Sequence, residues 1–176
     1  MSQVTHNFHK DCEDAINKQI NVELSVSASY VYMTMAYHFH RDDVALMGFH
    51  KYFKECSEEE REHAYRLMEY MNKRGGKIIL SEIKAPEKQE WTSPVEAMVD
   101  ALNLEKGVNE SLLHLHNVGS GHMDINLCDF LEQHYLQEQV DAIKEIGDHI
   151  TNLKRVGEGL GVYMFDQRLD KEAASN

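Results

Sequence analysis

The chain of 176 residues contains little proline and little cysteine, with two prolines and three cysteines. Both prolines, Pro86 and Pro94, lie in one short region, so residues 1–85 and 95–176 can form long helices without a helix breaker. The three cysteines, Cys12, Cys56 and Cys128, are far apart and odd in number. A disulfide framework is therefore not expected, and a reducing compartment, the cytoplasm, is favoured.

Basic residues and long apolar runs are also scarce. The 18 lysines and arginines stand against 30 aspartates and glutamates, which gives a net charge of −12. Such a chain offers little basic surface for phosphates, so we expect neither nucleic acid nor a membrane as a partner. No apolar stretch reaches the ~20 residues of a membrane span, and residues 1–11 contain no hydrophobic signal region.

The chain is rich in apolar residues and in groups that can bind metals. Apolar residues make up 42% of the sequence, which is enough for one folded core. The 11 histidines and 30 carboxylates are a large supply of metal ligands. Their number alone identifies no site, because most such side chains are solvated surface groups.

Apolar residues recur every three or four positions along most of the chain, which is the pattern of helices with one buried face. Residues 75–93, with the pair Gly75-Gly76, Pro86 and Trp91, differ in character and predict a long crossover. We therefore expect a single all-α domain over residues 1–176: a four-helix bundle whose crossover joins helices 2 and 3, with a short fifth helix at the C-terminus. The predicted helices span residues 10–39, 46–73, 94–119, 125–156 and 161–170.

A few polar residues interrupt these apolar stripes. Glu60 and His63 are three positions apart, so they share the inward face of the second helix. Glu105 lies on the stripe of the third helix, Glu23 beside that of the first, and Gln139 on that of the fourth. For one buried glutamate we would favour an ordinary ion pair. For this group on separate helices we favour a bound cation, because unpaired buried carboxylates cost several kcal/mol each.

Oxygen and imidazole ligands without cysteine suit iron or manganese. A helical di-metal site takes one glutamate from each of two helices and Glu-x-x-His from each of the other two. Here Glu23, Glu105 and Glu60-x-x-His63 match that pattern, but the fourth helix offers only Gln139-Val-Asp-Ala142. One metal position is well supplied with ligands and the other is poorly supplied. This asymmetry favours iron as a substrate that is bound, oxidised and released.

These residues resemble the ferroxidase-active heavy-chain type of animal ferritins, and we expect an invertebrate source. The similarity covers nearly the whole chain, and its most specific part is the run from Glu59 to Ala64 followed by an Arg-Gly-Gly turn. Other matching segments are Asn7-Phe8-His9, Tyr30-Val31-Tyr32, Arg41-Asp42-Asp43-Val44-Ala45-Leu46, Leu104-Glu105-Lys106, Leu127-Cys128-Asp129-Phe130-Leu131-Glu132, Glu138-Gln139-Val140 and Tyr163-Met164-Phe165-Asp166.

The resemblance implies an iron-storing cage of about 24 subunits, formed by this chain alone or with other ferritin chains. Each subunit would oxidise Fe(II) with O2 or peroxide at a two-iron centre and pass it to a ferric oxide mineral core. Glu23, Glu60 and His63 would hold the first iron, and Glu60 with Glu105 the second. Glu59 and Gln139 would assist, and Tyr32 would lie next to the site.

The resemblance also implies an entry channel, lined by Asp129 and Glu132 with Cys128 and His116 beside them, and a relay through Glu138. Without the family these acidic residues would be an ordinary helix face. At two further positions this chain departs from the family. Glu62 remains on the surface where mineral forms, but Tyr65 stands where a further glutamate is common. Arg168 stands where a pore histidine is usual. His40, His114 and His122 fall in turns or on helix exteriors, as solvated histidines do.

The first helix contains a departure that bears on the metal centre. Glu23 stands nine residues before Tyr32, whereas the family spacing is seven. Two extra residues turn a regular helix by about 200°. Either a π-type bulge absorbs them and Glu23 keeps its place, or Ser25 faces the site and a ligand is lost. A third reading keeps Glu23 and uses Tyr30 as the nearby tyrosine. We favour Glu23 with a local bulge.

Three other functions stay open at this stage. A storage subunit without ferroxidase activity would follow if the insertion removed Glu23 from the site. A di-iron oxygenase or a rubrerythrin-like redox protein would call for a second Glu-x-x-His, and the latter also for paired cysteines; the sequence has neither. A secreted helical cytokine is disfavoured by the missing signal region and by the polar residues in the core stripes.

Overall fold

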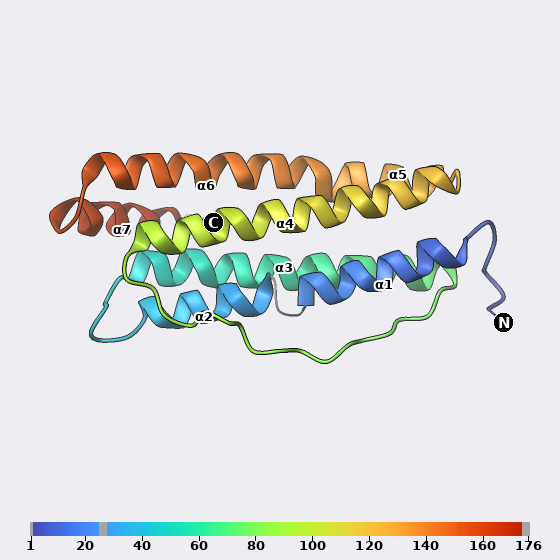
Figure 1. Cartoon of the computed structure of the whole chain (residues 1–176), viewed down its shortest axis with the longest axis horizontal. Helices are drawn as coiled ribbons and strands as arrows, with labels where there is room; N and C mark the ends of the chain where they lie inside the picture. Colours follow the sequence, from blue (N-terminus) through green and yellow to red (C-terminus); the bar gives the residue numbers. More distant parts are fainter. Residues whose placement is uncertain (1, 25–27, 174–176) are drawn as a thin grey trace.

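The described residues of the computed structural model, 2–24 and 28–173, form helices and no strands. The long helices lie side by side in one elongated bundle (Figure 1). This is the all-α, ferritin-like four-helix architecture expected from the sequence. In chain order the elements are α1 (Lys10–Leu24), α2 (Ser29–Phe39), α3 (Met47–Arg74), α4 (Pro94–Gly121), α5 (Ile125–Leu131), the π-helical turn η1 (Glu132–Leu136), α6 (Gln137–Val156) and α7 (Leu160–Ala173).

The described residues of the helix expected over 10–39 form α1 and α2, which lie end to end beside α3 (Figure 1). The predicted bulge and Ser25 fall in residues 25–27, outside the described part of the chain. The start of α2 is fixed to α3 by two hydrogen bonds. Ser29 Oγ donates to the carbonyl of Ser57 at 2.9 Å, and Ser57 Oγ donates to that of Ser29 at 2.7 Å. Both halves of the first helix therefore pack against the same neighbour.

The helix ends follow local sequence signals. Gly75 ends α3 with a left-handed φ of 77°, and its N–H donates to the carbonyls of Met71 and Asn72. Ser93 begins α4 by accepting a hydrogen bond from the N–H of Glu96, with Pro94 in the first turn. The expected helix over 125–156 contains the π-helical turn at 132–136, which the apolar pattern does not reveal.

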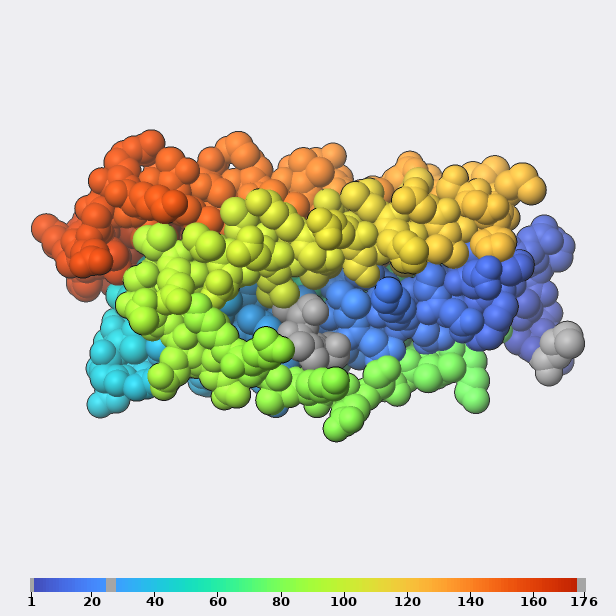
Figure 2. Space-filling model, viewed as in Figure 1, coloured from blue at the N-terminus to red at the C-terminus, as the bar shows by residue number. Residues whose placement is uncertain are grey.

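The crossover of residues 75–93 runs along the edge formed by α1 and α2 (Figures 1 and 2). Two asparagines of α1 hold it there through its backbone. Asn17 Oδ1 accepts from the N–H of Ile79 at 2.8 Å, and Asn21 Oδ1 accepts from that of Ser81 at 2.6 Å. The crossover is thus bound to the bundle by polar contacts and needs no secondary structure of its own.

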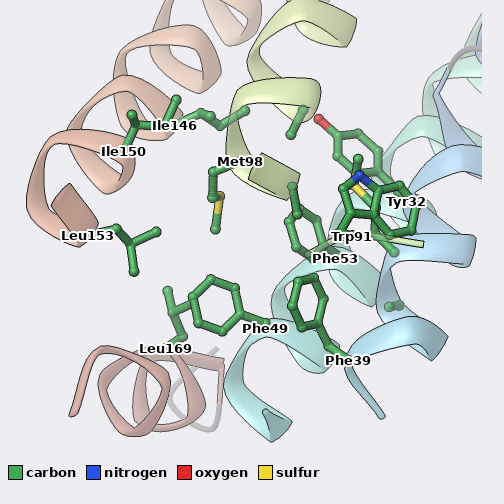
Figure 3. Close-up of a cluster of buried hydrophobic side chains, with 14 of the residues drawn as sticks. Tyr32, Phe39, Phe49, Phe53, Trp91, Met98, Ile146, Ile150, Leu153 and Leu169 are labelled. Carbon is green, nitrogen blue, oxygen red and sulfur yellow. The ribbon is translucent and has the colours of Figure 1, made fainter. Parts of the chain in front are cut away.

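The core consists of two hydrophobic clusters. One is rich in aromatic rings and includes Phe39, Phe49, Phe53 and Trp91 (Figure 3). The other is largely aliphatic, with Ile16, Ile20 and Leu67 among its members. Along α3, Phe53 belongs to the first cluster and Leu67 to the second. The polar residues Glu60 and His63 therefore lie between two apolar masses.

Within the described residues, no helix is both long and apolar enough to cross a membrane.

Candidate metal centre

Three potential metal ligands from two helices meet inside the bundle. Glu23 comes from the last turn of α1, and Glu60 and His63 come from the middle of α3. One ligand atom of each lies within 4.8 Å of the others. Glu23 is 0% exposed and Glu60 is 4% exposed. The three-residue spacing on α3 turns its two ligands to one face, and the packing of α1 against α3 adds the third.

The two carboxyl groups of this cluster are poorly compensated. Burial, and then the neighbouring Glu60, raises the pKa of Glu23 well above its usual value. Burial also raises the pKa of Glu60. The Oε2 atoms of both residues are buried and have no hydrogen-bond partner among the described residues. Buried polar atoms are normally satisfied, so this pair of oxygens beside an imidazole fits a cation.

The orientation of Glu23 is set by residues that the sequence pattern did not single out. Gln19, one turn earlier on α1, donates to Glu23 Oε1 at 2.6 Å. Gln19 Oε1 in turn accepts from the hydroxyl of Ser111 on α4 at 2.6 Å. The signal available in the sequence was a polar residue four positions before a buried glutamate. This chain of contacts leaves Glu23 Oε2 as the free oxygen.

The other side of the centre is built around Glu105 of α4, and here both carboxylate oxygens have partners. The buried hydroxyl of Tyr32 donates to Glu105 Oε1. Gln139 Nε2 donates to Glu105 Oε2 at 2.9 Å and to the Glu105 carbonyl at 3.1 Å. Burial, and then Glu105, raises the pKa of Tyr32 well above its usual value. Tyr30 points elsewhere and is 38% exposed.

A cavity of about 480 Å³ adjoins the centre, and Glu60, His63, Glu105 and Gln139 all line it. His63 Nε2 faces this cavity, 3.1 Å from Glu138 Oε2. Burial raises the pKa of Glu59 on the same wall. Further lining residues that the sequence did not single out include three acidic ones, one basic one and an aromatic one: Glu55, Glu145, Glu172, Arg66 and Tyr52. Acidic side chains outnumber basic ones on the cavity wall, so the cavity favours cations beside the ligand cluster.

The residues predicted to line an entry channel lie away from this centre, where α4 meets α5. His116 Nε2 is 2.7 Å from Glu132 Oε1, and the thiol of Cys128 donates to the His116 carbonyl at 3.7 Å. Asp129 accepts from Gln133 at 2.9 Å. Because these groups occupy the surface of one subunit, a channel would need neighbouring copies.

The remaining predicted positions are at the surface. Tyr65 is 51% exposed on α3, and Glu62 is exposed while also lining the cavity. Arg168 of α7 forms an ion pair with Glu172 at 2.8 Å. The structure thus brings together Glu23, Glu60, His63, Glu105, Gln139 and Tyr32, with Glu62 on the same cavity, whereas Tyr65 and Arg168 do not line it.

Comparison with known proteins agrees with this architecture. The family model Ferritin, described as a ferritin-like domain, matches residues 13–156. The chain is 59% identical over 167 residues to soma ferritin of Lymnaea stagnalis, covering 95% of each chain. It is 56% identical over 167 residues to ferritin-1 heavy chain of Schistosoma mansoni, again covering 95% of each. With the ferritin middle subunit of Salmo salar it shares 56% identity over 169 residues, covering 94% of this chain and 95% of that protein. The chain belongs to the ferritin family, whose members bind and store iron.

Proposed function

We propose that this chain is a ferroxidase subunit, which oxidises Fe(II) to Fe(III) within the bundle and stores the product as ferric oxide mineral. The observation that carries this proposal is the pair of buried oxygens of Glu23 and Glu60, which make no hydrogen bond to the described residues and lie next to His63. A cation would compensate both carboxylates and accept the imidazole lone pair. Two ferrous ions bound together would each lose one electron to O2 or peroxide.

The two iron positions would differ in strength. Glu23, Glu60 and His63 would hold the first iron with two carboxylates and an imidazole. Glu60 and Glu105 would hold the second, with Gln139 and Glu59 as weaker helpers. Because Tyr32 and Gln139 already occupy both oxygens of Glu105, iron at the second position must compete with those hydrogen bonds. The second iron should therefore bind weakly and leave readily, as a substrate would.

Side chains around the cavity support passage of the ion. The acidic side chains of the cavity wall attract Fe(II) and other cations to the centre. Glu138 lies against His63, so it can take part in moving iron between the centre and the cavity. Glu62, also on the cavity wall, would receive iron on its way to the mineral. Tyr32 would hold Glu105 in one orientation during these exchanges.

Members of this family generally assemble into cages, and we extend that to this chain with about 24 subunits, alone or with other ferritin chains. Asp129, Glu132, His116 and Cys128 would then line a channel where copies meet. A net charge of −12 on every chain would draw cations toward the assembled shell. The free thiols of its three cysteines agree with a cytoplasmic location.

The test is rapid mixing of anaerobic Fe(II) with the assembled, aerated protein, followed by the absorbance of Fe(III). We expect a fast oxidation phase in the unmodified protein and its loss in Glu60→Gln. Glu58→Gln is a matched control on the same helix, because Glu58 is exposed and pairs only loosely with Lys54 at 3.9 Å. Absence of a fast phase in the unmodified protein would contradict the proposal and indicate a storage subunit without ferroxidase activity.

A further inference from the structure

A second cluster of metal-ligand side chains lies at one end of the bundle, outside the centre described above. It consists of His9, just before α1, Asp11 in the first turn of α1, and His122 directly after α4. One ligand atom of each lies within 4.8 Å of the others. His9 and Asp11 are exposed, and His122 is half-buried. Residues more than one hundred positions apart in the sequence therefore meet here.

The donor atoms of this cluster converge on one carboxylate oxygen. Asp11 Oδ2 is 2.9 Å from His122 Nε2 and 3.5 Å from His9 Nδ1. The two imidazole rings are stacked, with centroids 3.7 Å apart and planes inclined by 14°. His9 Nδ1 also accepts a hydrogen bond from the backbone N–H of Asp11 at 3.1 Å, which holds this ring on the same side and which an ion bound at Nδ1 would replace. Stacking directs a nitrogen of each ring to the same small region beside Asp11.

The backbone that carries these side chains is firmly held. Arg74, at the end of α3, donates to the carbonyl of Asn7 at 3.1 Å and forms an ion pair with Asp124 at 2.8 Å. One arginine thus ties the segment before His9 to the turn after His122. The N–H of His122 also donates to the carbonyl of Val118 at 3.2 Å. Ordered ligand backbones reduce the entropy lost when an ion binds.

The kind of ligand follows from the donor set. Two imidazole nitrogens and one carboxylate oxygen suit borderline transition-metal ions, whereas Mg²⁺ and Ca²⁺ prefer oxygen ligands only. Because the cluster is exposed, water can complete the coordination. We propose that His9, Asp11 and His122 form a peripheral site for a divalent transition-metal ion, such as Zn²⁺, Co²⁺ or Fe²⁺.

This site is independent of iron oxidation inside the bundle. It lies at the end of the molecule where α4 passes into α5, the same end that carries Asp129 and Glu132. Its ligands come from the start of α1 and the end of α4, and none of them lines the internal cavity. An ion bound here would link the N-terminal segment to the turn between α4 and α5.

The experiment is a Co²⁺ titration of the assembled protein in the Glu60→Ala/His63→Ala background, which removes the internal ligand cluster. Co²⁺ binding is followed by its visible absorption and by equilibrium dialysis. His122→Gln and His9→Gln should each lose about one equivalent of Co²⁺ per chain, or weaken it at least about tenfold. His114→Gln is the control, because His114 is an exposed histidine of α4 outside the cluster.

Crystals soaked in Zn²⁺ give a second, direct readout. Anomalous density should lie between His9 and His122 beside Asp11, and it should disappear in His122→Gln. Circular dichroism and the size of the assembly show whether each variant is folded. If His9→Gln and His122→Gln fold and bind as much Co²⁺ as His114→Gln, with the same spectrum, the proposal is wrong.

Discussion

The internal and peripheral clusters have the same number of potential ligands held within the same distance, but their surroundings are opposite. Glu23, Glu60 and His63 lie between the two hydrophobic clusters of the bundle. His9, Asp11 and His122 lie in solvent at its end. In the internal cluster two buried carboxylate oxygens make no hydrogen bond, and Glu60 Oε2 lies 3.8 Å from His63 Nδ1, whereas Asp11 Oδ2 lies 2.9 Å from His122 and 3.5 Å from His9.

This difference separates the expected strength of the two sites. Burial makes charged carboxylates costly, so a cation bound in the internal cluster compensates their charge and removes that cost. In the peripheral cluster, water and the histidines already form hydrogen bonds with Asp11. A cation that binds there must replace these hydrogen bonds, so its net binding free energy is small. Although the two clusters hold the same number of ligands within the same distance, the internal cluster should bind a cation more tightly. Only the internal cluster also has the adjoining cavity and the additional carboxylate that a reaction of two metal ions needs.

The largest expected effect comes from removing two internal ligands together. In Glu60→Ala/His63→Ala, the initial rate of Fe(II) oxidation should fall by about 100-fold or more, because neither iron position keeps its shared carboxylate. Stopped-flow absorbance measures this rate. Co²⁺ binding at the peripheral cluster should stay unchanged in the same variant. If this variant lost Co²⁺ binding at the peripheral cluster as well as Fe(II) oxidation, the two clusters would not be independent.

A second change, on α6, should make the centre keep its iron after oxidation instead of releasing it. Gln139→Glu with Ala142→His gives α6 the Glu-x-x-His pattern of a complete di-metal site, and Ala142 lines the cavity with room beside it. After one round of oxidation and a chelator wash, this variant should keep about two irons per chain, while the unmodified protein keeps fewer. Metal analysis provides the measurement, with Ala142→Gln as a control of similar size. Equal retention in all three proteins would contradict the role given to Gln139.

Stability without metal should depend on pH through the internal carboxylates. Their raised pKa values mean that the folded chain holds protons which the unfolded chain, whose glutamates have the ordinary pKa of 4.5, has released above that pH. Stability of the metal-free protein should therefore fall as pH rises above about 4.5. At pH 8, Glu60→Gln should be more stable than the unmodified protein by a few kcal/mol, because each unit by which burial raises the pKa of Glu60 corresponds to about 1.4 kcal/mol.

Guanidinium unfolding in the presence of chelator, at pH 5 and pH 8, measures this difference. The advantage of Glu60→Gln should shrink at pH 5, because the folded chain keeps this carboxyl group protonated and the unfolded chain has released its proton only in part. Glu58→Gln, at an exposed position, should show no such dependence. If Glu60→Gln were less stable than the unmodified protein at pH 8, the buried carboxylates would not destabilise the metal-free fold, and the prediction would be wrong.

The smallest effect on stability is expected from the hydrogen bond between Tyr32 and Glu105. Tyr32→Phe removes the hydrogen bond to Glu105 and should lower the free energy of unfolding by about 1 kcal/mol. Tyr37→Phe is a matched control, because Tyr37 is 57% exposed. Denaturant unfolding at pH 7 without metal gives both values. An equal loss in the two variants would argue against a special role for the Tyr32 contact.

Much of the fold could be predicted because helix formation depends on local patterns. Apolar spacing indicated the long helices, and the glycine pair and Ser93-Pro94 marked the ends of the crossover. The same periodicity placed Glu60 and His63 on one inward face. The π-helical turn at 132–136 was harder to predict, because a single extra residue in the hydrogen-bond ladder barely changes the apolar pattern.

The sequence by itself determined the helical architecture, the ligand pair on α3 and the shortage of ligands on α6. Only the tertiary structure decided which residues from other helices join them. Glu23 stands beside Glu60, Tyr32 rather than Tyr30 contacts Glu105, and His9 meets His122. The reason is physical: helical periodicity fixes the face that a residue occupies on its own helix. Which faces meet depends on packing between segments far apart in the chain.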